Sequence, residues 1–315
     1  MKNVTFGNLH KWVQDMGMTV SKNTLRNWLK KGKKHLDKYD TYPEGICFGE
    51  GCYSELRRDL VQSKEIQQVH EEVHVVLVNK VQGIVIFYDE GSSGRTVLSN
   101  FLGKADLKAL MSDGYNAYTF LDGELEKTDH LICMAHAKVK FEKAYQHGDD
   151  PVAKEFADMI SELYDLEEGY RLRDLSEEDI AAERQGEYTE DIVQRIRRRL
   201  DEELRKDNEY RSPYMMQALN YLDHFWDGLF LYRKYGSYPM DNNLAERSVR
   251  PFTTKRKYSL HFGGDDGVEM SAVYHSIIST LKLCGKSVWN FFGDYFRCEV
   301  LGLDTYKEYL PALSR

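Results

Sequence analysis

The chain has 315 residues, and its 51 acidic side chains outnumber the 43 lysines and arginines, giving a formal net charge of −8 at pH 7. Hydrophobic residues make up 42% of the sequence and aromatic residues 12%, which excludes a disordered chain. The length predicts about two domains. The acidic balance argues against a nucleic-acid ligand, because phosphate binding requires clustered lysines and arginines.

Cysteine usage and apolar patterning predict a cytoplasmic protein with no membrane partner. The cysteines are Cys47, Cys52, Cys133, Cys284 and Cys298. Because their number is odd and their spacing wide, we expect reduced thiols rather than a disulfide framework. The most apolar stretch, residues 74–88, contains Asn79 and Lys80 and is too short to cross a bilayer, and the N-terminus has no apolar signal-peptide region.

The first 40 residues predict two short helices joined by a turn. Leu9, Val13 and Met16 recur at helical spacing. Gly17 interrupts the pattern, and Ser21 can cap a second helix. The basic residues of this second helix are Lys22, Arg26, Lys30, Lys31, Lys33 and Lys34. The pattern is typical of a helix-turn-helix DNA-binding element, with Arg26 and Lys30 as candidate DNA contacts. The alternative is a plain helical hairpin whose basic face is only solvated.

The middle of the sequence predicts a mixed α/β core. In chain order we expect a loop over residues 41–52, a charged helix over 53–66, buried strands over 73–78 and 83–88, a helical pattern over 94–110, a strand over 130–134 and a helix through 141–145. The expected strands are short, apolar and rich in β-branched residues, as strands buried in a sheet are. Strands that alternate with helices are typical of an α/β sheet covered by helices.

Residues 149–209 differ from the rest of the chain. They contain 21 acidic and 10 basic residues, a net charge of −11, so the remaining residues carry +3. Their leucines and isoleucines are spaced for amphipathic helices, which predicts an acidic helical insertion. An aromatic-rich helix over 214–235 and a long helical stretch over 268–296 are expected after it. Local charge outside the insertion therefore permits the nucleic-acid ligand that the net charge disfavours.

Asp113 stands at the carboxyl end of a predicted strand, after an apolar run, and begins an Asp-Gly turn with Gly114. Ligands and metal ions gather at the carboxyl ends of strands in α/β sheets, so a carboxylate at this point is well placed to hold a cation. The alternative is that Asp113 only starts the turn.

A second segment combines a helix start with one acid among bases. It is Pro239-Met240-Asp241-Asn242-Asn243-Leu244-Ala245-Glu246-Arg247-Ser248-Val249-Arg250-Pro251. Asp241 or Asn242 can cap a helix that begins directly afterwards, on which Glu246 and Arg250 share one face. The neighbouring bases are Arg247, Arg250, Lys255, Arg256 and Lys257. A lone carboxylate in a cationic strip suggests a metal ligand beside a phosphate backbone, and the alternative is an ordinary salt-bridged helix start.

A third segment, Cys133-Met134-Ala135-His136, holds two residue types that bind zinc. No further pair of zinc ligands stands nearby in the sequence. Core packing and a hydrogen-bonded histidine therefore explain this segment better than a zinc site does.

Three strings occur in a specific order: Ser112-Asp113-Gly114-Tyr115-Asn116-Ala117-Tyr118, then Cys133-Met134-Ala135-His136-Ala137, then the segment that contains Asp-Asn-Asn-Leu-Ala-Glu-Arg. Together they closely resemble the DDE transposases of bacterial insertion-sequence family 66. The resemblance covers about residues 50–300 and is most specific in the third string. It implies an α/β fold with a ribonuclease-H-like core, interrupted by the helical insertion, and an enzyme that cuts and joins DNA at transposon ends.

The resemblance also implies roles for individual residues. Asp113 matches the family's second catalytic Asp and Glu246 its catalytic Glu, and both would bind metal. The residues with an implied supporting role are Cys133, His136, Asn242 and Asn243. Contacts with DNA phosphates would fall to Arg247, Arg250, Lys255, Arg256 and Lys257. The implied cofactor is Mg²⁺, with two ions in an active site and Mn²⁺ as a substitute.

The family's first catalytic Asp, in an Asp-Glu-Thr motif on the first strand, has no direct counterpart. The best local match is Val69-His70-Glu71-Glu72-Val73, which puts His70 at that position. A neutral nitrogen would then replace an anionic oxygen, which magnesium disfavours. Glu71, Glu72 or Asp89 could supply a third carboxylate, depending on strand register. We therefore expect strand transfer to be impaired or absent.

Two other functions remain open. One is a non-catalytic transposase remnant that binds transposon ends, and the other is a helical interaction protein with no DNA role. For the transposase we expect transposon-end and target DNA as partners, a homo-oligomer on DNA, and a cytoplasmic, nucleoid-associated location in a bacterium. The expected parts are residues 1–40 (helix-turn-helix-like), 41–65 (linker and helix), 66–148 (first part of the core), 149–238 (helical insertion) and 239–315 (second part of the core).

Overall fold

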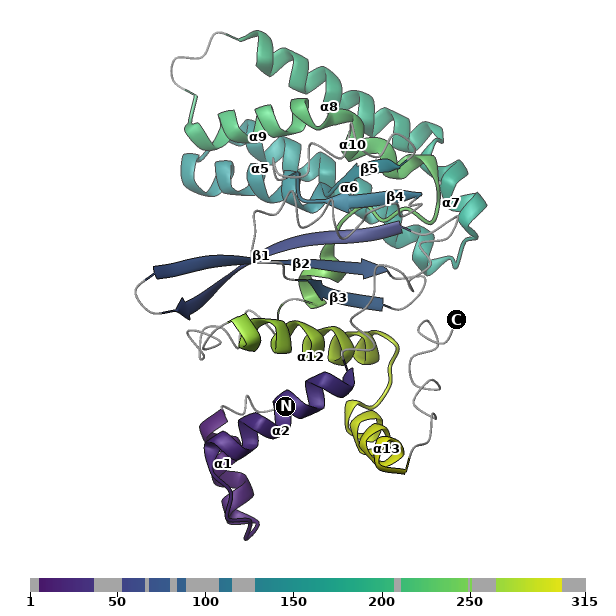
Figure 1. The fold of residues 1–315 in the computed structure, drawn as a ribbon. Helices are drawn as coiled ribbons and strands as arrows, with labels where there is room; N and C mark the ends of the chain where they lie inside the picture. The colour runs from purple at the N-terminus through teal and green to yellow at the C-terminus, as the bar shows by residue number, and fades with distance from the viewer. Residues whose placement is uncertain are drawn as a thin grey trace. The chain divides into compact units, whose positions relative to one another are not determined.

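The computed structural model describes residues 6–36, 53–65, 68–79, 84–88, 108–114, 128–206, 211–248, 250 and 265–301 (Figure 1). The chain forms two compact units, which we name the first unit (Met1–Leu107 with Leu244–Arg315) and the second unit (Lys108–Asn243). Helices predominate among the described residues, and the second unit contains a small parallel sheet of two strands. None of the described helices is both long enough and apolar enough to cross a membrane.

The N-terminal helices of the first unit match the predicted pair. α1 (Phe6–Asp15) and α2 (Lys22–Leu36) are joined by a turn in which Gly17 has a φ of +83°, a conformation that glycine adopts without strain. The hydroxyl of Ser21 accepts a hydrogen bond from the Thr24 amide at 3.0 Å and caps α2. The two helices are thus confirmed, whereas their role in DNA binding stays a prediction.

Three antiparallel strands follow in the first unit: β1 (Tyr53–Glu65), β2 (Gln68–Asn79) and β3 (Ile84–Tyr88). The strands predicted over 73–78 and 83–88 are confirmed within β2 and β3. The charged helix predicted over 53–66 is wrong, because β1 pairs residue by residue with β2. Pairing with a β-branched partner strand outweighs the helix propensity of the leucines, arginines and lysine in β1.

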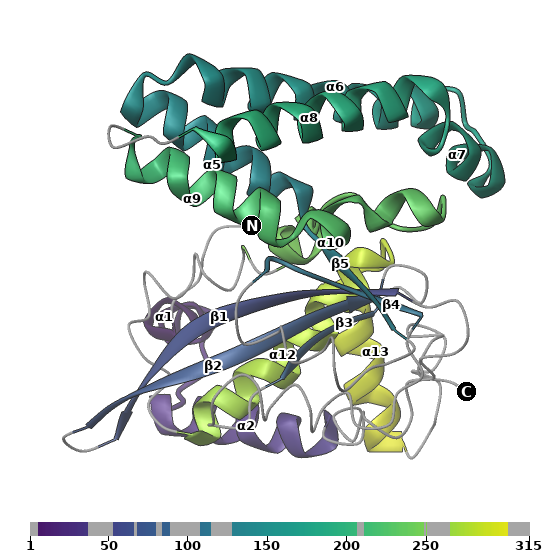
Figure 2. The same ribbon diagram turned by 90° about the horizontal axis from the view of Figure 1, so that it is seen from above.

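The C-terminal helices of the first unit pack with α2 and with the strands. α12 (Asp265–Leu283) and α13 (Val288–Leu301) divide the helical stretch predicted over 268–296, because Gly285, with a φ of +67°, ends α12. α12 contacts β3 and α2 and lies along the strands (Figures 1 and 2). The buried core at these helices consists of Leu36, Val273, Ile277, Leu281, Phe291 and Tyr295.

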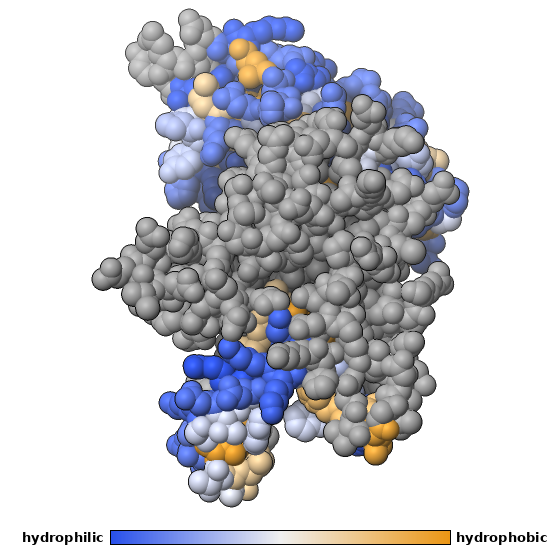
Figure 3. Space-filling view, viewed as in Figure 1, coloured by the Kyte–Doolittle hydropathy of each residue, from blue (hydrophilic) through white to orange (hydrophobic). Residues whose placement is uncertain are grey.

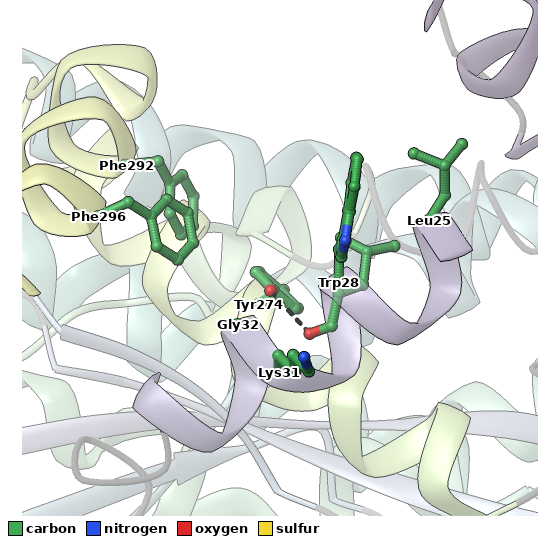
Figure 4. A pocket seen from close by; sticks show the side chains of 8 residues that line it. Leu25, Trp28, Lys31, Gly32, Tyr274, Phe292 and Phe296 are labelled. Atoms are coloured by element: carbon green, nitrogen blue, oxygen red, sulfur yellow. Dashed lines mark hydrogen bonds between the residues drawn. The ribbon is translucent and has the colours of Figure 1, made fainter. Parts of the chain in front are cut away.

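An open apolar groove of about 640 Å³ lies where α2 meets α12 and α13, with Trp28, Tyr274 and Phe296 among its lining side chains (Figure 4). The Tyr274 hydroxyl donates a hydrogen bond to the Leu29 carbonyl at 3.1 Å. A Cβ at Gly32 would lie 2.5 Å from that hydroxyl, so glycine lets α2 approach α12 closely. These contacts anchor α2 within the first unit.

The second unit contains the parallel pair β4 (Ala109–Ser112) and β5 (Asp129–Ile132). β5 leads through Cys133 into α5 (Met134–Gly148), so the strand predicted over 130–134 and the helix after it are confirmed. The helical pattern predicted over 94–110 is wrong at 109 and 110. These two residues belong to β4, where their backbone pairs with β5 and their apolar side chains are buried. Residues 94–107 and the loop predicted over 41–52 lie outside the described residues.

Helices complete the second unit, as predicted for the insertion. They are α6 (Pro151–Leu172), α7 (Glu177–Arg184), α8 (Glu187–Arg205), α9 (Pro213–His224), α10 (Trp226–Phe230) and the 3-10 helix η3 (Leu231–Lys234). The helix predicted over 214–235 is divided at Phe225, which ends α9. The side chains of Asp150, Ser176 and Ser212 cap α6, α7 and α9 by accepting hydrogen bonds from backbone amides.

Many acidic residues of the insertion pair with arginines of α8. Arg195 donates to Glu162 at 2.5 Å and Arg199 donates to Glu155 at 2.8 Å, and both pairs join α8 to α6. Hydrophilic residues cover most of the visible surface of these helices (Figure 3). Arg195 and Arg199 thus hold α8 against α6 through ion pairs within the insertion.

Candidate active site

Asp113 lies directly after β4, at the carboxyl end of the strand, and is half-buried. The hydroxyl of Tyr221, on α9, donates a hydrogen bond to the backbone carbonyl of Asp113 at 3.0 Å. Gly114 follows with a φ of +74°, and a Cβ there would lie 2.9 Å from the ring of Phe225. The turn after β4 therefore requires glycine, and packing from the insertion fixes the backbone of Asp113.

A buried serine and a histidine brace this turn. The hydroxyl of Ser112 lies 2.9 Å from Nε2 of His130, in β5, and accepts a hydrogen bond from the Gly114 amide at 3.3 Å. The contact joins β4 to β5 directly beside Asp113. Sequence reasoning missed His130, because it lies 18 residues from Ser112 and no sequence pattern connects the two.

Lys140, on α5, is a second residue that sequence reasoning missed. Its ammonium lies 4.8 Å from the centroid of the Tyr221 ring. Burial lowers the pKa of Lys140, the charge of Lys143 lowers it further, and the Asp113 carboxylate opposes both. A partly buried cation whose pKa responds to a neighbouring carboxylate is suited to bind a phosphate group. The basic run Lys138, Lys140 and Lys143 is the sequence signal that could have revealed it.

Cys133 links the end of β5 to the segment that precedes Glu246. The thiol is fully buried and accepts a hydrogen bond from the Asn242 amide at 3.4 Å. The next residue, Met134, donates its amide to the carbonyl of Met240 at 3.0 Å. Burial raises the pKa of the Cys133 thiol to about 12, so the group is neutral and suited to packing and hydrogen bonding rather than to nucleophilic or metal chemistry.

The predicted helix start after Asp241 is confirmed. A side-chain oxygen of Asp241 accepts a hydrogen bond from the Asn243 amide at 3.0 Å, and residues 243–248 are helical. Asn242 is buried, whereas Asn243 is exposed. Burial raises the pKa of Tyr164, on α6, and the neighbouring Asp241 carboxylate raises it further. The insertion therefore contacts this helix start as well as the turn at Asp113.

Glu246 is half-buried in this helical segment, and Arg247 and Arg250 are exposed. Asp113 belongs to the second unit and Glu246 to the first unit. Lys255, Arg256 and Lys257 lie outside the described residues. 

The remaining predicted residues lie on helices of both units. Arg26 and Lys30 are exposed on α2. His136 is half-buried on α5, three residues after Cys133. Within the described ranges, no three His, Cys, Asp or Glu side chains converge as a metal site.

Comparison with known proteins supplies the family. The sequence matches the family model described as Transposase IS66 family over residues 2–270. The chain belongs to the IS66 transposase family. An uncharacterized protein of Sinorhizobium fredii (strain NBRC 101917 / NGR234), y4jD, is 30% identical over 204 residues, which are 63% of this chain and 39% of y4jD. A second uncharacterized protein of that strain, y4qI, is 27% identical over 204 residues, 63% of this chain and 36% of y4qI. The chain thus spans about two fifths of the length of the curated relatives that it matches.

The resemblance to the IS66 family places the first catalytic Asp on the first strand of the core. The sequence aligns His70 with the first residue of the family's Asp-Glu-Thr motif. In the structure His70 lies in β2, opposite Ser63 of β1. The first described strand is β1, over residues for which the sequence predicts a helix. His70 is therefore not on the first strand, contrary to the sequence-based match. Glu71 and Glu72 also lie in β2, and Asp89 lies outside the described residues.

Proposed function

We propose that this chain is a transposase that cuts DNA and joins it at transposon ends, with Asp113 and Glu246 as metal-binding carboxylates in a ribonuclease-H-like core. Membership in the IS66 family supports the reaction class. The observation that carries the site is the placement of Asp113 after β4, where Ser112 and Tyr221 brace its backbone. Acidic residues at the carboxyl ends of strands are where α/β sheets bind ligands.

The side chains of Asp113 and Glu246 are of the chemical type that binds magnesium. Carboxylate oxygens are the ligands that Mg²⁺ prefers, and Asp113 and Glu246 would each offer them. A bound pair of metal ions supplies Lewis acidity at phosphorus and activates water or a 3′-hydroxyl. Lys140 would hold a phosphate beside Asp113, and Arg247 and Arg250 would neutralise phosphates beside Glu246.

Strand transfer is impaired in this proposal. The chain contains no Asp-Glu-Thr triplet, either in β1 or in β2. The acidic residues of β1 that could replace the missing first Asp are Glu55, Asp59 and Glu65, and Glu71 and Glu72 in β2 remain candidates. With only Asp113 and Glu246 as carboxylate ligands, the chain would hold a pair of metal ions less tightly than three carboxylates would, and DNA cleavage and joining would be slower.

The missing triplet also favours a second candidate, a DNA-binding transposase remnant that does not cut. This protein would bind transposon ends through α1 and α2 and through the bases beside Glu246. Its binding would depend on salt and would survive the loss of either carboxylate.

The test uses the full chain with end-labelled DNA taken from both ends of the element that encodes it, in Mg²⁺ and in Mn²⁺. The variants are Asp113→Ala and Glu246→Gln, and the matched control is Glu178→Gln, an exposed carboxylate on α7. We expect slow, metal-dependent nicking that both site variants abolish and the control retains.

Each other outcome decides between the candidates. Nicking that survives Asp113→Ala would contradict the assigned site. Salt-dependent binding without nicking in either metal, unchanged in both site variants, would favour the non-cutting remnant. Rapid strand transfer by the wild-type chain would contradict the impairment, and loss of that activity in Glu55→Gln, Asp59→Asn or Glu65→Gln would identify the third carboxylate.

A further inference from the structure

Arg184, the last residue of α7, is a buried hydrogen-bond hub. Its Nε and Nη2 atoms each donate to one carboxylate oxygen of Glu167, on α6, at 2.7 Å. The two N–H groups of its Nη1 atom are shared among the backbone carbonyls of Tyr232, Tyr235 and Tyr238, at 2.8, 2.6 and 3.0 Å from the nitrogen. One guanidinium therefore joins two insertion helices to the segment through which the chain leaves the insertion.

The exit segment, residues 231–238, contacts α7 at both ends of that helix. Arg233 donates from Nε to the carbonyl of Arg184 at 2.8 Å. A Cβ at Gly236 would lie 2.0 Å from the carbonyl oxygen of Glu177, so only glycine fits against the start of α7. Tyr232 lies in η3 and Tyr235 follows its last residue. Carbonyls at the end of a helix lack partners within that helix, and here the buried guanidinium of Arg184 bonds to them.

The other side of the exit segment is held by the first residue of β5. The Asp129 carboxylate accepts hydrogen bonds from Lys234 at 2.7 Å and from the Tyr238 hydroxyl at 2.8 Å. Beyond Tyr238, the carbonyl of Met240 and the amide of Asn242 bond to the start of α5, as described above. The exit segment is thus fixed between the insertion and β5 up to the residue before the helix of 243–248.

We propose that Arg184 is a positioning residue for the active site: paired with Glu167, it sets the path of residues 231–238 and so places the start of the helix that carries Glu246. The inference rests on the proposed function for the role of Glu246. It gives the helical insertion a task in the reaction, because Arg184 connects the insertion to that helix start.

The chemistry of the side chain supports this role. A lysine at 184 could not make two parallel bonds to a carboxylate and three bonds to carbonyls, since it has three donors and no planar fork. Losing Glu167 alone would leave a buried guanidinium without its counter-charge, which is costly. The hub therefore depends on both members of the pair.

The test compares Arg184→Lys with Arg195→Lys in the full chain. Arg195 is a matched control, because it also pairs with carboxylates in the insertion, Glu162 and Asp191, but has no hydrogen bond to residues 231–238. The first readout is amide hydrogen exchange, which needs no activity. We expect Arg184→Lys to raise exchange about tenfold in residues 231–248, the effect of one to two lost hydrogen bonds, and to leave α6 and α8 unchanged.

The second readout is the single-turnover nicking rate at saturating DNA, together with the Kd for DNA. Arg184→Lys should lower the rate about tenfold even at saturating DNA, because it misplaces Glu246. It should also raise the Kd, because Arg247 and Arg250 follow Glu246 on the same helix. A wild-type chain that does not nick would contradict the proposed function, whereas the exchange result would still decide whether Arg184 sets the helix start.

Two exchange results would overturn the inference. One is wild-type protection of residues 239–248 in Arg184→Lys, and the other is an even rise throughout α6, α7 and α8. Should Arg184→Lys fail to fold, the double variant Glu167→Leu with Arg184→Met provides the same test. It removes the buried cation and its half-buried partner at similar volume, which folds tolerate, but it leaves the three carbonyls without their donor.

Discussion

The Tyr221 hydroxyl and the Asp113 carbonyl form a hydrogen bond of 3.0 Å between residues 108 positions apart in the sequence. The ring of Tyr221 also lies beneath the Lys140 ammonium, at 4.8 Å from the centroid. One aromatic side chain of the insertion therefore contacts both the backbone of a candidate metal ligand and a candidate phosphate-binding cation. The insertion shapes the surroundings of Asp113.

Tyr221→Phe removes this hydrogen bond and keeps the ring. We expect a loss of about 1 kcal/mol in the free energy of unfolding, because the partly buried carbonyl of Asp113 loses its donor. Urea denaturation measures the change. The control is Tyr214→Phe, since Tyr214 is 45% exposed on the same helix. An equal effect of the two variants would contradict a special role of the Tyr221 hydroxyl.

Gly114→Ala tests the turn at the candidate site. A Cβ would meet the Phe225 ring at 2.9 Å, and the φ of +74° strains any residue with a side chain. We expect a loss of at least about 1–2 kcal/mol in the free energy of unfolding. Gly169→Ala is the matched control, because Gly169 lies within α6 with nothing inside 4 Å of its Cβ position. That change should stabilise the chain by about 0.5–1 kcal/mol, and a destabilised control would contradict the steric argument.

The helices could be predicted from sequence because their signals are local. The acidic helices α6 to α8 repeat apolar residues at helical spacing, and Ser21 and Asp241 stand where caps are expected. β1 could not be predicted, since its composition suits a helix and its structure depends on pairing with β2. Whether a segment forms a strand depends on the strand with which it pairs, and that pairing is not visible in the segment's own sequence.

The candidate site was predictable only in part, for the same reason. Asp113 and Asn242 stand in recognisable turn and cap patterns. His130, Lys140 and Arg184 matter through contacts that the sequence does not reveal, and the carbonyl partners of Arg184 lie 48 to 54 residues away. Residues that act through such distant contacts require a structure to be found.

Alkylation tests the buried state of Cys133. Burial raises the pKa of this thiol from 9.0 to about 12, so almost no reactive thiolate forms at pH 8.5. In native protein treated with iodoacetamide at that pH, we expect Cys133 to stay unmodified while the half-buried Cys284 reacts. Mass spectrometry of tryptic peptides measures both. In urea the two should react alike, and labelling of native Cys133 at the rate of Cys284 would contradict its burial.

The same pKa shift gives a stability prediction with a defined sign. The folded chain holds the Cys133 proton more tightly than the unfolded chain does, so this thiol favours folding below about pH 9. The contribution is lost as the pH rises from 9.0 toward about 12. Cys133→Ala should therefore flatten the fall in stability over that interval relative to the wild-type chain, as urea denaturation at several pH values would show.

Arg26 and Lys30 test whether α2 contacts DNA. Both are exposed on a helix that is anchored through the Tyr274 hydrogen bond to Leu29, and the acidity of the chain is concentrated elsewhere, in residues 149–209. The double variant Arg26→Ala with Lys30→Ala should weaken DNA binding roughly tenfold at 0.1 M salt, since two phosphate contacts are lost. The slope of log K against log salt should fall by about two units.

Fluorescence anisotropy at several salt concentrations measures both quantities, and Lys154→Ala is the control because Lys154 is an exposed cation of α6 paired with Asp158. The control should leave the slope unchanged. An unchanged slope in the double variant would identify the N-terminal pair as a plain helical hairpin. DNA contacts would then have to come from other bases, among which Arg247 and Arg250 are exposed beside Glu246.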